Sequence, residues 1–129
     1  MMVTLLLVDD SKWSVIALEV ALLKLPGISV LYAESGQSAW SLLEQHAVDA
    51  IVTDLQMPVM DGFELIARVR GTPATQAIPI IVVSADSSTE AQERARQLGA
   101  NSYFVKPCSP SAVRLKLEEL LDATQSRSR

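Results

Sequence analysis

Five short apolar runs restrict the fold of this chain more than any other feature. Each run is continuously apolar rather than alternating, which is typical of strands buried on both faces of a sheet. The runs lie at residues 3–8, 28–33, 48–53, 78–83 and 102–105. Segments with helical periodicity follow them, at 11–25, 36–46, 62–70, 88–98 and 110–123. Strands that alternate with helices in this way predict an α/β fold with a parallel sheet covered on both faces.

The strand order does not follow from periodicity. The flavodoxin-like order 2-1-3-4-5 is a common solution for a doubly wound sheet of five strands, and we expect it here. A chain of 129 residues has room for one domain. We therefore predict a single domain over residues 1–124, followed by a flexible tail at 125–129.

The helix boundaries are predicted from local chemistry. Pro26 and Gly27 are expected to end the first helix. The last helix should pack on the sheet through an apolar stripe of Val113, Leu117, Leu120 and Leu121. The third, fourth and fifth helices should each begin at a capping pair, namely Asp61 with Glu64, Ser87 with Glu90, and Ser109 with Pro110.

Composition excludes several classes of partner. The net charge of −4 and the pI near 4.9 leave no broad basic surface, so direct binding of nucleic acid is not expected. The N-terminal apolar run lacks a basic leader, and no apolar run reaches the length of a membrane span, so membrane insertion is not expected. The lone Cys108 cannot form an internal disulfide, which suits a reducing cytoplasm.

Polar residues follow four of the predicted strands. Asp9 and Asp10 follow the first strand, Asp54 the third, Ser84 the fourth and Lys106 the fifth. In a doubly wound fold, ligands bind beyond the carboxyl ends of the strands, so we expect these side chains to meet there. Each residue alone has an ordinary explanation as a cap or a turn residue, but together they indicate a site.

Three acids at one edge of a sheet require positive charge nearby. Two carboxylates about 4 Å apart repel by roughly 4 kcal/mol at an effective dielectric of about 20. Lys106 would supply one charge and a divalent cation two more. Mg²⁺ suits such a site because it binds a few carboxylates and keeps waters that a phosphoryl oxygen can replace. Mn²⁺ is an alternative cation.

This set of residues favours phosphoryl transfer to a carboxylate. An aspartate can act as a nucleophile and form an aspartyl phosphate, a reaction that depends on positioning and charge stabilisation. Asp54 follows the central strand and is the best-placed acceptor, with Lys106 and the Ser84 hydroxyl as the stabilising groups. Asp61, seven residues later, is better explained as a helix cap.

At these positions the sequence resembles the receiver domain of two-component response regulators over essentially its whole length. The resemblance rests on four markers in order: VDD at 8–10, DLQMPVMDG at 54–62, SA at 84–85 and KP at 106–107. It implies the flavodoxin-like fold and phosphorylation of Asp54 by a phosphohistidine, carried by a sensor histidine kinase or a histidine phosphotransfer protein.

The resemblance also implies roles for single residues. Asp10, Asp54 and the backbone carbonyl of Gln56 would bind Mg²⁺ directly, and Asp9 would hold a metal-bound water. Lys106 would contact the phosphoryl group, and the bond between Lys106 and Pro107 would be cis. Such chemistry is self-catalysed, so the chain would not be a turnover enzyme.

Signal output is implied by the same resemblance. Ser84 and Tyr103 resemble a switch pair that responds to the phosphoryl group, with plain core packing as the less favoured alternative for Tyr103. Gln56 and Asp86 occupy positions that tune dephosphorylation. The switch would change binding of a downstream protein at the face formed by the fourth helix, fifth strand and fifth helix. Homodimerisation is left open.

Three further residues carry expectations. Trp13 should pack, either over the acidic site or onto the core. Cys108 should act as a small hydrophobe. His46, near the end of the second helix, should lie on the surface or stabilise the helix dipole rather than carry phosphate.

Three other functions compete with a phosphoacceptor. A phosphatase with an aspartate nucleophile would carry a second acid where Gln56 stands. A flavodoxin-like cofactor binder would need a phosphate-cradling loop, and Asp9 and Asp10 would repel that phosphate. An interaction module that works without phosphorylation would not need the complete set of acids, hydroxyl and lysine, and a lack of Mg²⁺ affinity would favour it.

Overall fold

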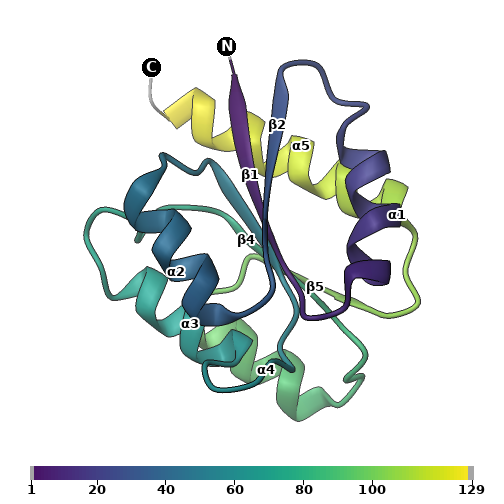
Figure 1. Cartoon of the computed structure of the whole chain (residues 1–129), viewed down its shortest axis with the longest axis vertical. Helices are drawn as coiled ribbons and strands as arrows, with labels where there is room; N and C mark the ends of the chain where they lie inside the picture. The colour runs from purple at the N-terminus through teal and green to yellow at the C-terminus, as the bar shows by residue number, and fades with distance from the viewer. Residues whose placement is uncertain (1, 128–129) are drawn as a thin grey trace.

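The sheet has the predicted flavodoxin-like order. A computed structural model describes residues 2–127 of the chain. Five parallel strands lie in the order β2-β1-β3-β4-β5 (Figure 1). Their bounds are β1 Val3–Val8, β2 Ile28–Ala33, β3 Ala50–Thr53, β4 Ile80–Ser84 and β5 Ser102–Val105.

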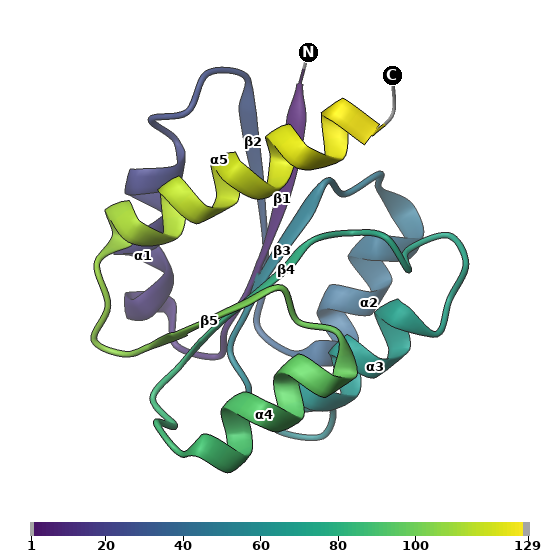
Figure 2. The same ribbon diagram turned by 180° about the vertical axis from the view of Figure 1, so that it is seen from behind.

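Five helices cover the two faces of this sheet (Figures 1 and 2). Two helices, α1 and α5, pack on one face, and α2, α3 and α4 pack on the other. Their bounds are α1 Lys12–Leu22, α2 Gly36–Gln45, α3 Gly62–Arg70, α4 Thr89–Leu98 and α5 Pro110–Arg127.

The apolar runs are continuous because both faces of the central strands are buried. In β1, Leu5 and Leu7 belong to the cluster under α1 and α5, whereas Leu6 and Val8 belong to the cluster under α2, α3 and α4. Successive side chains of a strand point to opposite faces, so a strand with helices on both sides needs an apolar residue at every position. The predicted stripe of α5 faces the first of these clusters: Val113, Leu117 and Leu121 are buried, and Leu120 is partly buried.

Three predicted helix ends were wrong, although α2 misses by a single residue because it ends at Gln45 rather than at residue 46. The first helix ends at Leu22 rather than at residue 25, and tight turns follow it, with Lys24 N–H donating to Ala21 O and Leu25 N–H to Leu22 O. The last helix continues to Arg127, past its predicted end at 123 and into the predicted tail. No glycine or proline lies between Asp122 and Arg127 to end it. Residues 128–129 lie outside the described part of the chain.

The predicted cap of the fourth helix was also wrong. The N-cap is Ser88, whose hydroxyl accepts the N–H of Ala91 at 3.1 Å, and not Ser87. The carboxylate of Asp86 accepts the N–H of Ser88 at 2.9 Å, which holds Ser88 at the start of the helix. The third and fifth helices use the predicted residues Asp61 and Ser109, which accept from Glu64 N–H and Ala112 N–H.

No helix within residues 2–127 is both long and apolar enough to cross a membrane.

Candidate functional site

Three acids meet at the carboxyl end of the sheet. Asp9 and Asp10 follow β1, and Asp54 follows β3, its neighbour in the sheet. The strands are in register there, because Val8 pairs with Thr53 and the Asp54 N–H donates to Val8 O at 2.8 Å. One carboxylate oxygen from each acid lies within 4.8 Å of the others. Asp9 and Asp54 are buried, whereas Asp10 is exposed.

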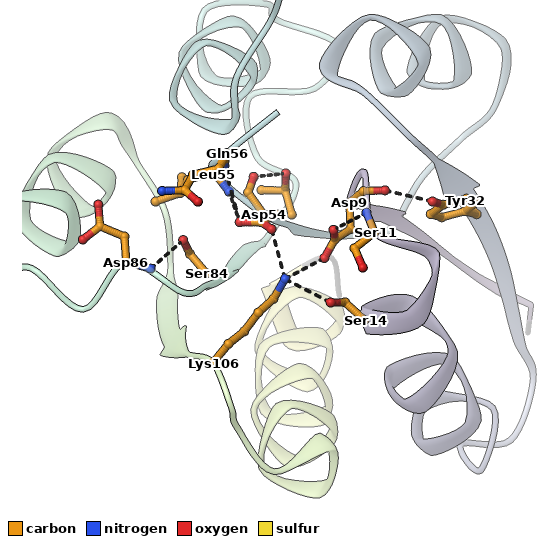
Figure 3. A network of polar contacts seen from close by, with 11 residues as sticks. Asp9, Ser11, Ser14, Tyr32, Asp54, Leu55, Gln56, Ser84, Asp86 and Lys106 are labelled. Atoms are coloured by element: carbon orange, nitrogen blue, oxygen red, sulfur yellow. Dashed lines mark hydrogen bonds and ion pairs between the residues drawn. The ribbon is translucent and has the colours of Figure 1, made fainter. Parts of the chain in front are cut away.

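Lys106 brings positive charge to these acids from β5. Its ammonium Nζ lies 2.9 Å from Asp9 Oδ2 and 3.0 Å from Asp54 Oδ2, and it also donates to Ser14 Oγ at 3.4 Å (Figure 3). Burial alone would lower the pKa of Lys106, but its hydrogen bonds and charge interactions with Asp9 and Asp54 outweigh burial and raise that pKa above its ordinary value. The lysine is therefore charged at neutral pH and links the two buried carboxylates.

Backbone amides hold the other oxygens of the same two acids. Asp9 Oδ1 accepts the Ser11 N–H at 2.8 Å, and Asp54 Oδ1 accepts the Leu55 N–H at 2.6 Å (Figure 3). The Gln56 N–H also points to Asp54 Oδ1, at 3.4 Å. Hydrogen bonds from backbone amides fix the orientation of a carboxylate. Asp9 and Asp54 are thus positioned before any ligand binds.

Asp61 takes no part in this cluster. Its side chain accepts the Glu64 N–H at 2.9 Å and caps α3. The next residue, Gly62, brings the start of α3 against the strand end, because a Cβ at position 62 would lie 2.2 Å from Asp54 O and 2.7 Å from Leu55 Cα. The Asp-Gly pair therefore sets the short loop that presents Asp54.

Ser84, Asp86 and Tyr103 form a chain of hydrogen bonds beside the acids. The Ser84 hydroxyl is fully buried and accepts the Asp86 N–H at 3.2 Å. The Tyr103 hydroxyl donates to Asp86 O at 2.6 Å. Burial raises the pKa of Tyr103, and the nearby carboxylates of Asp86 and Asp54 add to this effect, while the Ser84 hydroxyl opposes it. Tyr103 thus stays a neutral donor, and the loop after β4 joins it to Ser84.

The donor set suits a hard divalent cation. Carboxylate oxygens are the ligands that Mg²⁺ prefers, and it needs few of them because it retains water. Asp10 is open to solvent and, within residues 2–127, forms no ion pair with a lysine or arginine, unlike Asp9 and Asp54. Asp10 also lines an open hollow of about 420 Å³ together with Gln56, Asp61 and Asp86, which gives solvent access to the acids.

Trp13 was predicted to pack, and this prediction was wrong. Its side chain is 84% exposed and covers neither the acidic site nor the core. The helix turns Val15, Ala21 and Leu22 toward the sheet, and residue 13 falls on the opposite side. Because α1 is apolar on most sides, periodicity alone could not decide which residues face inward.

Other expected residues lie as follows. Cys108 is partly buried against the cluster under α1 and α5, where burial raises the pKa of its thiol. His46 is the exposed C-cap residue of α2. The Lys106–Pro107 peptide bond is cis, the isomer that the resemblance implies. The Gln56 carbonyl as a metal ligand stays a prediction.

Sequence reasoning missed two residues of the site. Ser14 contacts Lys106 from the first turn of α1, and the Tyr32 hydroxyl donates to Asp9 O at 2.9 Å from β2 (Figure 3). Ser14 lies four residues after Asp10, so helical spacing could have placed it on the turn above the acids. Tyr32 gave no such signal, since an aromatic residue in a strand is ordinarily packing.

Comparison with known proteins decides the family. The model of the response regulator receiver domain matches residues 5–118, which include Asp9, Asp10 and Asp54 as well as Ser84 and Lys106. The chain belongs to the response regulator receiver family. As a member of that family it is a protein of two-component signalling, and the predicted resemblance is confirmed.

Relatives of this receiver domain include chemotaxis proteins. It is 37% identical to a chemotaxis protein CheY homolog of Campylobacter jejuni, over 91% of this chain and 91% of that protein. It is 44% identical over 101 residues to a gliding motility regulatory protein of Myxococcus xanthus, of which it spans 13%. Among solved structures, a putative response regulator from Chloroflexus aurantiacus is similar with a TM-score of 0.88 and 32% identity, covering 95% of this chain and 99% of that one.

Proposed function

We propose that this receiver domain accepts a phosphoryl group at Asp54 from a phosphohistidine, in a Mg²⁺-dependent reaction, and that the phosphorylated form changes its binding to a protein target. The observation that carries the proposal is the Lys106 ammonium, which lies within 3.0 Å of both Asp9 and Asp54 beside the exposed Asp10. Phosphoryl transfer requires a nucleophilic carboxylate, a positively charged hydrogen-bond donor and a set of acids that can bind a metal ion.

The transfer itself is a displacement at phosphorus. An oxygen of the Asp54 carboxylate forms the new P–O bond while the P–N bond of the phosphohistidine breaks, and the imidazole nitrogen keeps the electron pair. Lys106 would move from the carboxylate oxygens to the incoming phosphoryl oxygens, which carry more charge. Mg²⁺ (or Mn²⁺), held by Asp10, Asp54 and the Gln56 carbonyl with Asp9 through water, would neutralise the phosphoryl charge.

The donor and the target follow from this chemistry. A sensor histidine kinase or a histidine phosphotransfer protein would supply the phosphohistidine. A dianion at Asp54 would draw the Ser84 hydroxyl toward it and so weaken the bond from Asp86 N–H to Ser84. Because Tyr103 is bonded to the same Asp86, the change would reach α4, β5 and α5. A hollow of about 330 Å³ between α4 and β5, lined in part by Tyr103, supports a binding role for this face.

Mass spectrometry with a small-molecule phosphodonor tests the proposal. With Mg²⁺ present, the chain should gain the mass of one phosphoryl group, and removal of Mg²⁺ with a chelator should prevent the gain. Asp54→Asn should abolish the addition because an amide is not a nucleophile here. The matched control is Asp61→Asn, which changes an acid of the same loop that only caps α3. An unchanged mass in the wild-type chain, or equal losses in both variants, would contradict the proposal.

A further inference from the structure

Four large apolar side chains stand exposed on α1 and the residue that caps it. Trp13 is 84% exposed, Ile16 45%, Val20 58% and Leu23 51%. We call these four residues the α1 stripe. Single exposed apolar residues are normal on protein surfaces, but a contiguous apolar row marks an interaction site. Figures 1 and 2 show α1 at an outer edge of the molecule, where a partner can approach it.

The spacing of the stripe fits a helical partner. The residues follow one another at intervals of three, four and three, which is the a, d, a, d pattern of a heptad repeat. They lie on one side of the helix, opposite Val15 and Leu22, which are buried against the sheet. Side chains with this spacing insert between the side chains of a second helix laid along them.

We propose that the α1 stripe pairs with the same stripe of a second copy of this chain, with the two α1 helices parallel. With Trp13 at position a, Glu19 is a g residue, and Lys24, in the tight turn just past the C-cap Leu23, stands where the e residue of the next heptad would be. In a parallel pair, a g residue meets the partner's e residue five positions later, so Glu19 of each copy faces Lys24 of the other. An antiparallel pair would instead bring the two copies of Glu19 together.

The size of the stripe predicts a weak dimer. A buried tryptophan contributes about 150–250 Å². With the three aliphatic side chains, two stripes would bury on the order of 1,000 Å², at the lower limit of specific interfaces. Association should therefore be reversible and visible only at high protein concentration.

Analytical ultracentrifugation of the full chain over a concentration series tests the pairing. The wild-type chain should show a monomer–dimer equilibrium, and Trp13→Ala with Ile16→Ala should raise the dissociation constant at least tenfold. Both side chains are exposed, so an unfolding curve should confirm that the variant folds. The matched control is Leu115→Ser, which removes an apolar side chain that is 60% exposed on α5. It should leave the dissociation constant unchanged.

A charge exchange tests the parallel orientation and the identity of the partner. Glu19→Lys alone and Lys24→Glu alone should each weaken the dimer severalfold, because each creates two like-charged contacts. The double variant should restore the wild-type dissociation constant. The proposal is overturned if the wild-type chain stays monomeric to millimolar concentration, or if the double variant fails to recover the wild-type dissociation constant. It is also overturned if the stripe associates only with a helical phosphodonor protein and not with a second copy of this chain.

Discussion

At the scale of single residues, Lys106 decides whether the site holds together without a metal. Its ammonium is bonded to two buried carboxylates whose mutual repulsion would otherwise oppose folding. Removing the lysine from such a cluster lowers the free energy of unfolding by more than the ion pairs contribute to it. The two carboxylates are then left without a compensating charge in a partly buried environment. Lys106 therefore serves stability as well as the proposed chemistry.

Replacing Lys106 with methionine should lower the free energy of unfolding by about 2 kcal/mol, less than for a fully buried pair because the lysine side chain is 23% accessible. The raised pKa of Lys106 means that its contribution is fully present below its ordinary value of 10.5 and is lost as pH rises above that. Urea unfolding should thus give a constant difference between wild type and variant from pH 7 to about 10, and a smaller one above.

Lys116→Met is the matched control for this measurement. Lys116 forms an exposed ion pair with Glu119 at 3.6 Å, and such pairs contribute about 0–1 kcal/mol. Equal effects of the two lysine substitutions, or a difference for Lys106 that grows above pH 10.5, would show that the contact with the acids does not stabilise the fold.

Val59 carries backbone strain within the loop that presents Asp54. Its φ is 67°, in the left-handed region that β-branched residues rarely adopt, and its side chain is 81% exposed. Val59→Asn should raise the free energy of unfolding by about 1 kcal/mol, because asparagine tolerates this conformation. Thermal unfolding should show a smaller gain for Val59→Ala, which keeps a Cβ. No gain in either variant would mean that the conformation is not strained.

At the scale of elements, the junction between β3 and α3 depends on one missing Cβ. A side chain at position 62 would meet the Asp54 carbonyl oxygen at 2.2 Å and Leu55 Cα at 2.7 Å, and both are backbone atoms that cannot rotate away. The helix can begin next to Asp54 only because this position is glycine.

Gly62→Ala should therefore lower the free energy of unfolding by roughly 2–4 kcal/mol and slow phosphorylation of Asp54, since the strand end must shift. Gly71→Ala is the control: it ends the same helix, has a φ of −85°, and its Cβ would meet Ala67 O at 3.2 Å. Its effect should stay within about 0.5 kcal/mol. Chemical unfolding and mass spectrometry measure both. If the two alanine variants behave alike, close approach at Gly62 is not what positions Asp54.

Most elements could be predicted from the sequence because hydrophobic pattern and the chemistry of turns and caps are physically independent signals that agree there. β1, β2, β5 and α3 have the predicted bounds, since turn residues or capping pairs agree there with hydrophobic pattern. The errors fall where two local signals compete. Ser87 and Ser88 both offer a hydroxyl at the start of α4, and only the bond from Ser88 N–H to Asp86 selects the second. Nothing in the sequence ranks these two serines.

At the scale of the whole molecule, the site exists because strands distant in the sequence end at one edge of the sheet. Lys106 and Asp9 are 97 residues apart and lie in contact. The parallel α/β pattern predicted this convergence once the strands were recognised. Tyr32 could not be assigned in the same way, because its role depends on a side-chain direction that the packing of β2 sets.

The acidic cluster also predicts how the whole fold should respond to Mg²⁺. A ligand that binds the folded chain alone stabilises it by about 2.7 kcal/mol at a concentration one hundred times its dissociation constant. The melting temperature should therefore rise with Mg²⁺ and fall back when a chelator is added.

Asp10→Asn should reverse part of this behaviour. In chelator, the variant should be about 0.5–1 kcal/mol more stable than wild type, because one of three clustered negative charges is gone. The gain is small because position 10 is exposed and solvent screens the repulsion. In Mg²⁺ it should gain less than wild type, so that the order of stability inverts. Calorimetry in both conditions measures the two differences. A variant that is less stable in chelator, or that gains as much from Mg²⁺ as wild type, would mean that Asp10 neither repels its neighbours nor binds the ion.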